Sequence, residues 1–398
     1  MEEKHLKIDK KLSYEAIEKY LSIINNTTVQ LNLEIPKKLD YKGFGYLPSL
    51  LLVVFSWMRK HSGKLIIDLK IQDDSEIKEF VTDYYGYSII STIWKTCDIV
   101  TKDGEPLKKY FIPYTAKMHE MIDHLDKGLP NEAILIPCFD HYSKEKGLSH
   151  WFYFSDYKFA IAPSQLETSI YRIIEKLRTI YYSRIQNNTV DLFDSLLKIV
   201  WELLRNTDEH ATKDYLNESR LMPNCRGVYF KIHRSSAKNF IEQSDHDGLK
   251  SFFAESFSDI SSPFLLEISV FDSGPGLVKR FLGRDWLESI TIDQEIDTIK
   301  KCLIKGQTSV SNVDGISKGY GLDEVLKVLG KKEGFLKIRT GRASVFRDLR
   351  KSPYSITQSI ENVDLYDWES MNKSDYSKMN PTEGTLITLA YPLTSKTK

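Results

Sequence analysis

Apolar residues recur with a helical spacing in two adjacent stretches near the middle of the chain. In residues 164–186, the apolar side chains that fall on one side of a helix are Leu166, Ile170, Ile173, Ile174, Leu177 and Ile180. After a break at Asn187-Asn188-Thr189, the spacing of three and four continues through Leu192, Phe193, Leu196, Leu197, Val200, Leu203 and Leu204. Because this period gathers apolar side chains along one stripe, the pattern predicts two consecutive amphipathic helices.

Shorter apolar runs follow, each bounded by turn residues. They predict strands at 226–233, 265–271, 335–340 and 385–391, and a helix at 322–329 that ends at Gly330. Helices packed on one face of a mainly antiparallel sheet form an α+β sandwich, which is the fold class expected for residues 164–398. Residues 235–262 and 342–383 are longer than ordinary connections, so we interpret them as insertions, which are often functional at this size.

The first third of the chain alternates between strand and helix patterns. Residues 28–35 and 64–69 predict strands, and the strongly apolar segment between them, at 46–61, is typical of a buried helix. Asp73-Asp74-Ser75-Glu76 predicts a cap before a helix that reaches about Tyr84. This order predicts a small α/β domain with parallel strands. Further strands are expected near 133–138 and 151–162, although the pattern assigns no fold to residues 94–163.

Composition narrows the class of protein. A chain of 398 residues is long for one core, so we expect two domains, 1–163 and 164–398. Hydrophobic residues make up 41% and charged residues 28%, the balance of a soluble globular protein. Lys+Arg and Asp+Glu both number 55, which argues against a nonspecific nucleic-acid binder. The cysteines are scattered and the apolar run at 47–58 is too short to span a bilayer, so a cytoplasmic protein without a membrane partner is expected.

Glu202 and Asn206 lie four residues apart in the second amphipathic segment, within Trp201-Glu202-Leu203-Leu204-Arg205-Asn206. On a helix this spacing places both side chains on one flank, beside the apolar stripe. An amide oxygen is a ligand type that Mg²⁺ accepts, and a carboxylate one turn away can take a proton from an attacking water. The same spacing also occurs in ordinary amphipathic helices whose polar residues only face water.

A glycine-rich turn follows the strand at 265–271, with the sequence Asp272-Ser273-Gly274-Pro275-Gly276. A carboxylate only accepts hydrogen bonds, so Asp272 suits the exocyclic amine of adenine, whereas guanine would present a second acceptor. Gly274 and Gly276 let the backbone approach a ligand closely. An ordinary β-turn has the same composition, so this motif is open to both interpretations.

A second glycine-rich turn, Gly315-Ile316-Ser317-Lys318-Gly319-Tyr320-Gly321-Leu322, runs straight into a predicted helix. Backbone N–H groups and the positive end of the helix dipole make such a turn an anion site. Lys318 adds a charge there, unless it is simply a solvated lysine. The turn is not a Walker A loop, because no Gly-Lys-[Ser/Thr] follows the right spacer.

In this order, and with Gly384-Thr385 at the start of the last strand, these segments resemble the N, G1, G2 and G3 boxes of the GHKL ATPases. That superfamily includes gyrase, mismatch-repair ATPases, heat-shock chaperones, histidine kinases and anti-sigma kinases. The resemblance covers about residues 164–392 and implies that Mg-ATP binds the C-terminal domain, with Asn206 on Mg²⁺ and Glu202 as general base. Its nucleotide-binding positions, from adenine to phosphates, are Asp272, Gly274, Gly276, Thr385, Lys318, Gly319, Tyr320, Gly321 and Leu322, and residues 278–317 would be the ATP lid.

The strand–helix order of residues 1–163 resembles the STAS-like domains found beside GHKL ATPases. In those domains a phosphorylatable residue occupies the position of Ser75, although a helix N-cap is the favoured interpretation of this serine. A protein partner of unknown identity is expected, a homodimer is left open, and nucleic acid is not indicated.

The resemblance implies an ATP-driven conformational switch. Two other functions stay open: a serine/threonine protein kinase of the anti-sigma type, whose acceptor lies on another chain or domain, and a module that binds ATP without turnover. A histidine kinase is disfavoured, because no histidine lies between His150 and His210 to serve as the phospho-acceptor before the N box.

Overall fold

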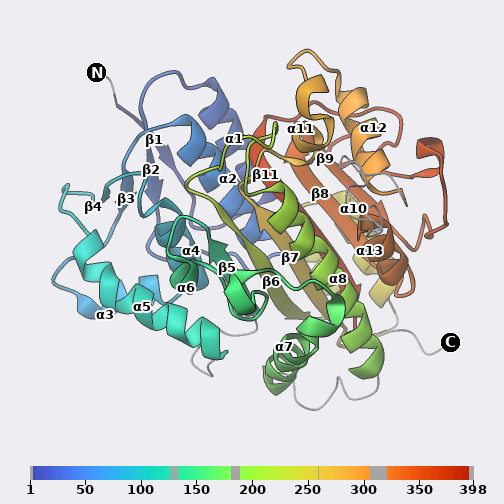
Figure 1. Cartoon of the computed structure of the whole chain (residues 1–398), viewed down its shortest axis with the longest axis horizontal. Coiled ribbons are helices and arrows are strands. Elements are labelled where there is room, and N and C mark those ends of the chain that lie inside the picture. Colours follow the sequence, from blue (N-terminus) through green and yellow to red (C-terminus); the bar gives the residue numbers. More distant parts are fainter. Residues whose placement is uncertain are drawn as a thin grey trace.

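The computed structural model describes residues 3–125, 129, 133–180, 189–258, 260–304 and 321–393. Its strands form two sheets: a four-stranded sheet from the N-terminal part and a seven-stranded sheet from the remainder. The smaller sheet lies on the left of Figure 1 and the larger on the right, with helices around both. The chain is therefore an α/β protein built on two sheets.

The N-terminal sheet is parallel throughout, in the order β1-β2-β3-β4. Its strands are β1 (Lys4–Lys7), β2 (Leu31–Ile35), β3 (Leu65–Ile67) and β4 (Ile99–Thr101). The helices of this part are α1 (Tyr14–Asn26), α2 (Tyr46–Lys60), α3 (Asp74–Val81), α4 (Tyr84–Ile93) and α5 (Lys108–His124). Helices connect each strand to the next, as parallel pairing requires. The predicted alternation with parallel strands is confirmed.

Two details of the N-terminal prediction are wrong. The helix expected to reach about Tyr84 is α3, which ends at Val81, and a second helix, α4, begins at Tyr84, where the Asp83 carboxylate accepts a hydrogen bond from the amide of Tyr85 (2.8 Å) and caps it. The N-cap of α3 is Asp73, whose side chain accepts from the amide of Glu76 (2.9 Å). Ser75 therefore lies within the first turn of α3 and does not cap it.

Helix α2 lies between the two sheets. All its residues from Tyr46 to Met58 are buried. On one side the Trp57 indole N–H donates to the carbonyl of Leu31 in β2 (2.7 Å), and on the other Phe55 meets Phe271 of β7 (Phe264–Asp272), with ring centroids 6.3 Å apart. A helix that is apolar all round belongs in a core. Here that core is shared by both sheets.

The larger sheet is antiparallel, with the strand order β10-β9-β8-β11-β7-β6-β5. Besides β7, its strands are β5 (Ala133–Phe139), β6 (Cys225–Arg234), β8 (Phe335–Gly341), β9 (Ala343–Asp348), β10 (Tyr366–Asp367) and β11 (Thr382–Pro392). The four strands predicted for the C-terminal region are confirmed as β6, β7, β8 and β11. Strand β5 pairs with β6, so a strand that precedes the expected boundary at 163 belongs to this sheet.

Helices cover the larger sheet on both faces. Helix α8 (Thr189–His210) packs on β6 and β7 and contacts α7 (Glu167–Ile180) and α13 (Gly321–Gly330) (Figure 1). The other face is covered by α2 and by α10 (Asp247–Phe257), whose Phe252 meets Phe335 of β8 with ring centroids 5.3 Å apart. The sequence predicted helices on one face only. The second layer was missed because α2 comes from a distant part of the chain.

The remaining elements are short. They are α6 (Lys144–Gly147), α9 (Ala237–Gln243), α11 (Leu277–Leu282) and α12 (Ile292–Cys302), with 3-10 turns at Ser155–Tyr157, Pro163–Leu166, Gly283–Asp285 and Ile360–Asn362. Residues 235–262 hold α9 and α10, and residues 342–383 add β9 and β10 to the sheet. The strand expected near 151–162 is not formed. Tyr153 and Phe159 make only an isolated bridge, because the chain between them reverses in a 3-10 turn in which Asp156 and Tyr157 both have positive φ (59° and 57°).

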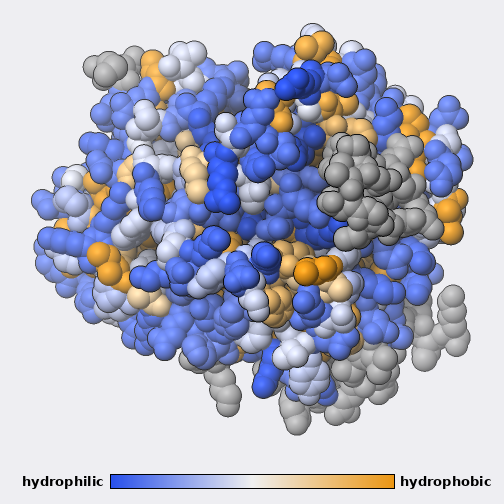
Figure 2. Space-filling view, in the orientation of Figure 1, coloured by the Kyte–Doolittle hydropathy of each residue, from blue (hydrophilic) through white to orange (hydrophobic). Residues whose placement is uncertain are grey.

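The face of the molecule seen in Figure 2 is mainly polar, and its apolar residues form small, separate patches. Among the helices of the described residues, none combines the length and the apolar character that a membrane span needs.

Candidate functional site

Helix α8 turns its apolar stripe to the sheet and carries the candidate polar pair on its flank. Glu202 and Asn206 are both half-buried, as their spacing of four predicted for residues beside the stripe. Arg205 lies over the Trp201 ring (4.9 Å to the centroid) and its Nε donates to Glu209 (2.9 Å). Ring and carboxylate together fix the arginine beside the pair.

The Glu202 carboxyl has an unusual protonation equilibrium. Burial raises its pKa from 4.5 to about 7, the charge of Arg205 opposes this, and the carboxylates of Glu324 and Glu209 add to it. A carboxyl group with a pKa near neutrality can accept and release a proton at physiological pH. Glu202 therefore has the protonation behaviour expected of a general base.

The first residue of α13, Gly321, lies against this pair. A Cβ at Gly321 would stand 3.0 Å from Oε2 of Glu202 and 3.3 Å from Nδ2 of Asn206. The backbone at the start of α13 thus lies close to both side chains, and a Cβ at this position would require them to move by a few tenths of an ångström. Because the N-terminus of a helix carries the positive end of its dipole, it favours an anion at this point.

Leu322, the next residue, is buried and belongs to the core side of α13. Lys318, Gly319 and Tyr320 lie outside the described residues. Residues 305–317 of the expected lid lie outside them as well. The described part of the lid, 278–304, contains α11 and α12.

Asp272 is the last residue of β7 and is buried among three strands. It stands opposite Thr385 of β11 and Arg226 of β6. Its Oδ1 accepts a hydrogen bond from the amide of Gly274 (2.9 Å). Burial raises the pKa of Asp272 from 3.8 to about 7, while hydrogen bonds from the backbone of Gly274 and Thr385 and the charge of Arg226 oppose the rise.

The glycines around Asp272 are required by close backbone contacts. Gly276 (φ +86°) and Gly384 (φ +80°) have backbone conformations that L side chains rarely adopt. A Cβ at Gly384 would lie 1.8 Å from the carbonyl oxygen of Asp272, and the amide of Gly384 donates to the carbonyl of Gly274 (2.8 Å). The turn Asp272–Gly276 and the segment Gly384-Thr385, far apart in the sequence, therefore pack directly on each other.

A further hydroxyl, Thr340, was missed by sequence reasoning. Its Oγ1 accepts from the amide of Leu277 (2.9 Å) and lies 3.1 Å from Oγ1 of Thr385. It is the last buried residue of β8 before Gly341. A polar residue at the end of a predicted strand was therefore a signal available in the sequence, but the sequence did not give the strand order that places Thr340 beside Thr385.

Arg226 was also missed. This buried arginine makes a two-pronged contact with Asp140 (Nε–Oδ2 3.0 Å, Nη2–Oδ1 2.8 Å) and donates to the Tyr153 hydroxyl. Nη2 of Arg226 also lies 3.4 Å from Oδ1 of Asp208 in α8. Arg226 therefore ties the end of α8 to the strand next to Asp272.

The two halves of the candidate site meet at the end of α8. A Cβ at Gly274 would stand 2.7 Å from the Cα of Ala211, the residue after α8. Asn206 precedes Ala211 by five residues, about 7.5 Å along a helix. The helix-borne pair and Asp272 therefore lie on the same face of the sheet, and the structure brings together Glu202, Asn206, Gly321, Asp272, Gly274, Gly276, Gly384 and Thr385.

No group of three or more His, Cys, Asp or Glu side chains is arranged to hold a metal ion within the part of the chain that the structure describes. Asn206 offers a single amide oxygen. That fits Mg²⁺, which keeps most of its coordination for water and phosphate oxygens.

No known family model, curated protein or solved structure matches this chain.

Proposed function

We propose that the chain is a Mg-ATP-binding ATPase of the GHKL type, with a Bergerat-type C-terminal fold, that acts as a nucleotide-dependent conformational switch. One observation carries the proposal. The start of α13 lies on Glu202 and Asn206, while the end of the same helix α8 contacts Gly274 behind Asp272. A phosphate-binding end and an adenine-binding end are thereby held on one face of one sheet.

Asp272 accounts for the adenine end. Its carboxylate accepts a hydrogen bond from the exocyclic amine of the base, and the neighbouring hydroxyls of Thr340 and Thr385 supply further polar contacts. Guanine has a carbonyl oxygen at that position, which would leave two acceptors facing each other. A buried polar group without a partner costs about 1–3 kcal/mol, so adenine nucleotides are preferred.

Asn206 and α13 account for the phosphate end. The Asn206 oxygen would hold Mg²⁺, which when bound neutralises phosphate charge. The N-terminus of α13, at Gly321, lies against the side chains of Glu202 and Asn206. Glu202 accepts a proton from the water that attacks the γ-phosphorus, as the bond from that phosphorus to the bridging oxygen breaks and ADP leaves with that oxygen. Its pKa of about 7 suits this transfer.

The N-terminal part contacts the nucleotide-binding segments from the opposite face of the sheet. Ser56 of α2 accepts a hydrogen bond from the amide of Glu383 (3.0 Å) and lies 3.2 Å from Oγ1 of Thr382, just before Gly384-Thr385. Arg59 of α2 reaches the carbonyl of Ser273 (3.4 Å). A movement of these segments on ATP binding would pass directly to α2 and the parallel sheet, which we propose as the STAS-like readout domain.

The test follows free phosphate and labelled protein together, after incubation with γ-labelled ATP and Mg²⁺. Wild type should release phosphate. Glu202→Gln should bind ATP but release phosphate at least about 100-fold more slowly, the usual contribution of a general base. Asp194→Asn, on an exposed position of α8, is the matched control and should be unchanged.

Asn206→Ala should lose the Mg²⁺-dependent part of ATP binding. Label transferred to the protein or to a partner would favour the anti-sigma type of kinase instead. Tight binding without either product would favour a non-hydrolysing module. An absence of adenine-nucleotide binding would refute the proposal as a whole.

A further inference from the structure

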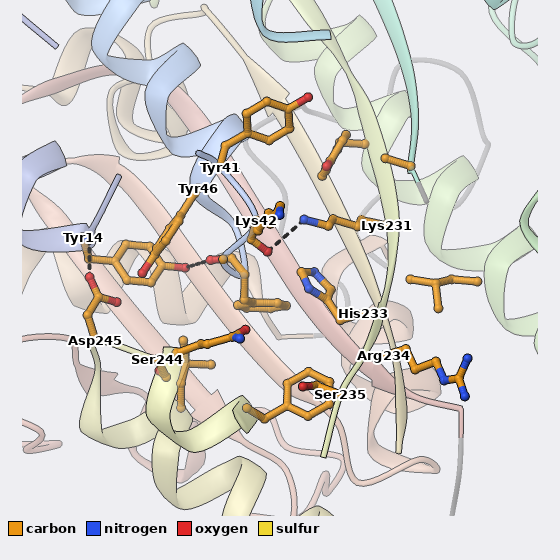
Figure 3. Close-up of a pocket in the computed structure, with 18 of the residues that line it drawn as sticks. Tyr14, Tyr41, Lys42, Tyr46, Lys231, His233, Arg234, Ser235, Ser244 and Asp245 are labelled. Atoms are coloured by element: carbon orange, nitrogen blue, oxygen red, sulfur yellow. Dashed lines mark hydrogen bonds between the residues drawn. The ribbon is translucent and has the colours of Figure 1, made fainter. Parts of the chain in front are cut away.

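A cavity of about 490 Å³ lies on the face of the large sheet that is turned away from the candidate nucleotide site (Figure 3). It is enclosed by α1, the segment 39–46, the start of α4, strand β6, and helices α9 and α10. Along β6, Tyr229 and His233 turn toward the cavity, whereas Arg226 belongs to the opposite face, where it meets Asp208 of α8. The volume is that of a pocket for a small organic molecule.

Aromatic rings form much of the cavity wall. Tyr14 and Tyr46 meet edge to face with ring centroids 5.3 Å apart, and Phe44 and Phe253 meet in the same way at 6.5 Å. The Tyr14 hydroxyl donates to the carbonyl of Phe44 (2.6 Å), which fixes the Tyr14 ring. Rings that are held in this way offer flat faces, rich in electrons, to a second ring or to a cation.

Asp83 places a carboxylate at the α4 end of the cavity. It accepts hydrogen bonds from the Tyr41 hydroxyl (2.9 Å) and the amide of Tyr85 (2.8 Å), which are both neutral donors. Burial raises the pKa of Asp83, the two hydrogen bonds oppose the rise, and the charge of Glu79 adds to it. Within the described ranges, no cationic side chain forms an ion pair with this carboxylate. A second carboxylate, Asp245, lies at the exposed rim of the cavity.

The Tyr229 hydroxyl is an unmet polar group of the cavity wall. Tyr229 is 2% exposed, and its hydroxyl has no hydrogen-bond partner among the described residues. Buried hydroxyls normally have a partner, because leaving one unpaired is costly. Burial raises the pKa of Tyr229 well above its usual value, and the charges of Glu267 and Asp83 contribute to the rise. A neutral hydroxyl near negative groups presents its oxygen to a hydrogen-bond donor, and a cationic donor is favoured there.

The basic side chains of the cavity wall have partners or lie at its rim. Lys231 donates to the carbonyl of Lys42 (2.8 Å) and stands directly opposite Glu267 in the register of β6 and β7, where opposite charges attract. His233 is held against the same carboxylate (2.7 Å). Lys42 and Arg234 are exposed, and Figure 3 shows Arg234 pointing away from the cavity. The charge balance of the buried wall therefore favours a cationic ligand.

We propose that this cavity binds a small arylalkyl amine in its protonated form. The ammonium group donates hydrogen bonds to the Tyr229 hydroxyl and to the Asp83 carboxylate, and the ring packs among Phe44, Phe253 and Tyr46. A carboxylate has about four acceptor positions, so Asp83 can keep its present donors. The cavity lies across the sheet from the candidate nucleotide site, so the inference does not depend on the proposed ATPase function.

The test is titration calorimetry of the full chain in phosphate buffer at neutral pH, with benzylamine, phenethylamine, benzyl alcohol and benzoate as probes. One of the two amines should bind saturably with a dissociation constant of about 1 mM or below. It should bind at least about tenfold more tightly than benzyl alcohol, which has the ring without the charge, and benzoate should bind more weakly still. The proposal is overturned if neither amine binds, or if benzyl alcohol or benzoate binds as tightly as both amines.

Two variants of the wall locate the binding. Asp83→Asn removes the charge but keeps an oxygen that caps α4, so it should weaken amine binding at least about tenfold and leave benzyl alcohol binding unchanged. Tyr229→Phe removes only the unpaired hydroxyl, so it should melt no lower than wild type and bind the amine at least about threefold more weakly. The matched control is Glu242→Gln, at an exposed carboxylate of α9 outside the cavity wall, which should bind as wild type.

If Asp83→Asn does not fold by circular dichroism, Tyr229→Phe decides alone. An amine affinity that is unchanged in a folded wall variant, or that falls equally in Glu242→Gln, would refute the assignment to this cavity.

Discussion

Replacing Asp272 by asparagine should change how stability depends on pH, as well as remove nucleotide binding. The wild-type carboxyl is buried at the end of β7, where burial raises its pKa from 3.8 to about 7. The folded protein therefore binds this proton more tightly than the unfolded chain does. The contribution of this carboxyl group to the free energy of unfolding is therefore largest at low pH, and it falls as the pH rises from about 4 to about 7.

The size of the effect follows from the two pKa values. A difference of about three pKa units is worth about 4 kcal/mol in total, of which about 2.5 kcal/mol falls between pH 5 and pH 8. Asparagine does not titrate, and its side-chain oxygen can still accept from the amide of Gly274. From pH 5 to pH 8, Asp272→Asn should therefore gain about 2.5 kcal/mol of stability relative to wild type.

Urea unfolding of both proteins without nucleotide, at pH 5, 6, 7 and 8, measures this difference directly. Comparing the two proteins at each pH removes the contribution of every other titrating group. Parallel pH curves would refute the reasoning, because they would mean that the Asp272 carboxyl is no harder to ionise in the folded state. At pH 8, ATP should raise the melting temperature of wild type and leave that of Asp272→Asn unchanged.

Three further results are expected. At saturating ATP, kcat should rise with pH through about 7, because Glu202 must lose its proton to act as a base, and a profile flat from pH 6 to pH 8 would contradict that role. Gly384→Ala should lower the free energy of unfolding in urea by at least about 3 kcal/mol, because the new Cβ would overlap the carbonyl of Asp272. The control Gly104→Ala, at a glycine with a similar φ but open space around it, should lower it by only about 1–2 kcal/mol. Glu18→Gln should lower the free energy of unfolding by about 2 kcal/mol, because it breaks a two-pronged pair with buried Arg339 (2.9 and 3.0 Å); a change below about 0.5 kcal/mol would place the pair among weak surface contacts.

The fold was predictable where a pattern is local. The apolar period of α8, the strands β6, β7, β8 and β11, and the parallel order of the N-terminal part all depend on residues close in sequence. The two-sided burial of the large sheet does not. In β8, Lys337 and Arg339 alternate with apolar residues, which is typical of a strand with one wet face.

The structure buries both of these cations. Lys337 lies over the rings of Tyr14 and Trp368, at 3.4 and 3.9 Å from their centroids, and burial lowers its pKa to about 7. Arg339 pairs with Glu18 of α1. These partners lie more than three hundred residues upstream or some thirty downstream, so no local pattern could identify them.

The sequence likewise predicted only those parts of the candidate site that depend on local patterns. Glu202 and Asn206 share a flank because their spacing requires it, and Asp272 and Thr385 stand at strand ends that the sequence located. Thr340 and Arg226 join them only through the order of strands in the sheet, which single-sequence patterns do not fix. The pKa of Glu202 is raised mainly by burial, with a further contribution from Glu324, a residue of α13.

The position of α2 has a consequence for the integrity of the molecule. Because its whole circumference is covered by protein, removing it would expose the hydrophobic interiors of both sheets at once. The C-terminal half cut free at residue 164 would also lose β5 and leave the edge of β6 open to pairing with other chains. The two sheets should therefore melt in one cooperative step, and a ligand that stabilises either should protect the other to the same degree.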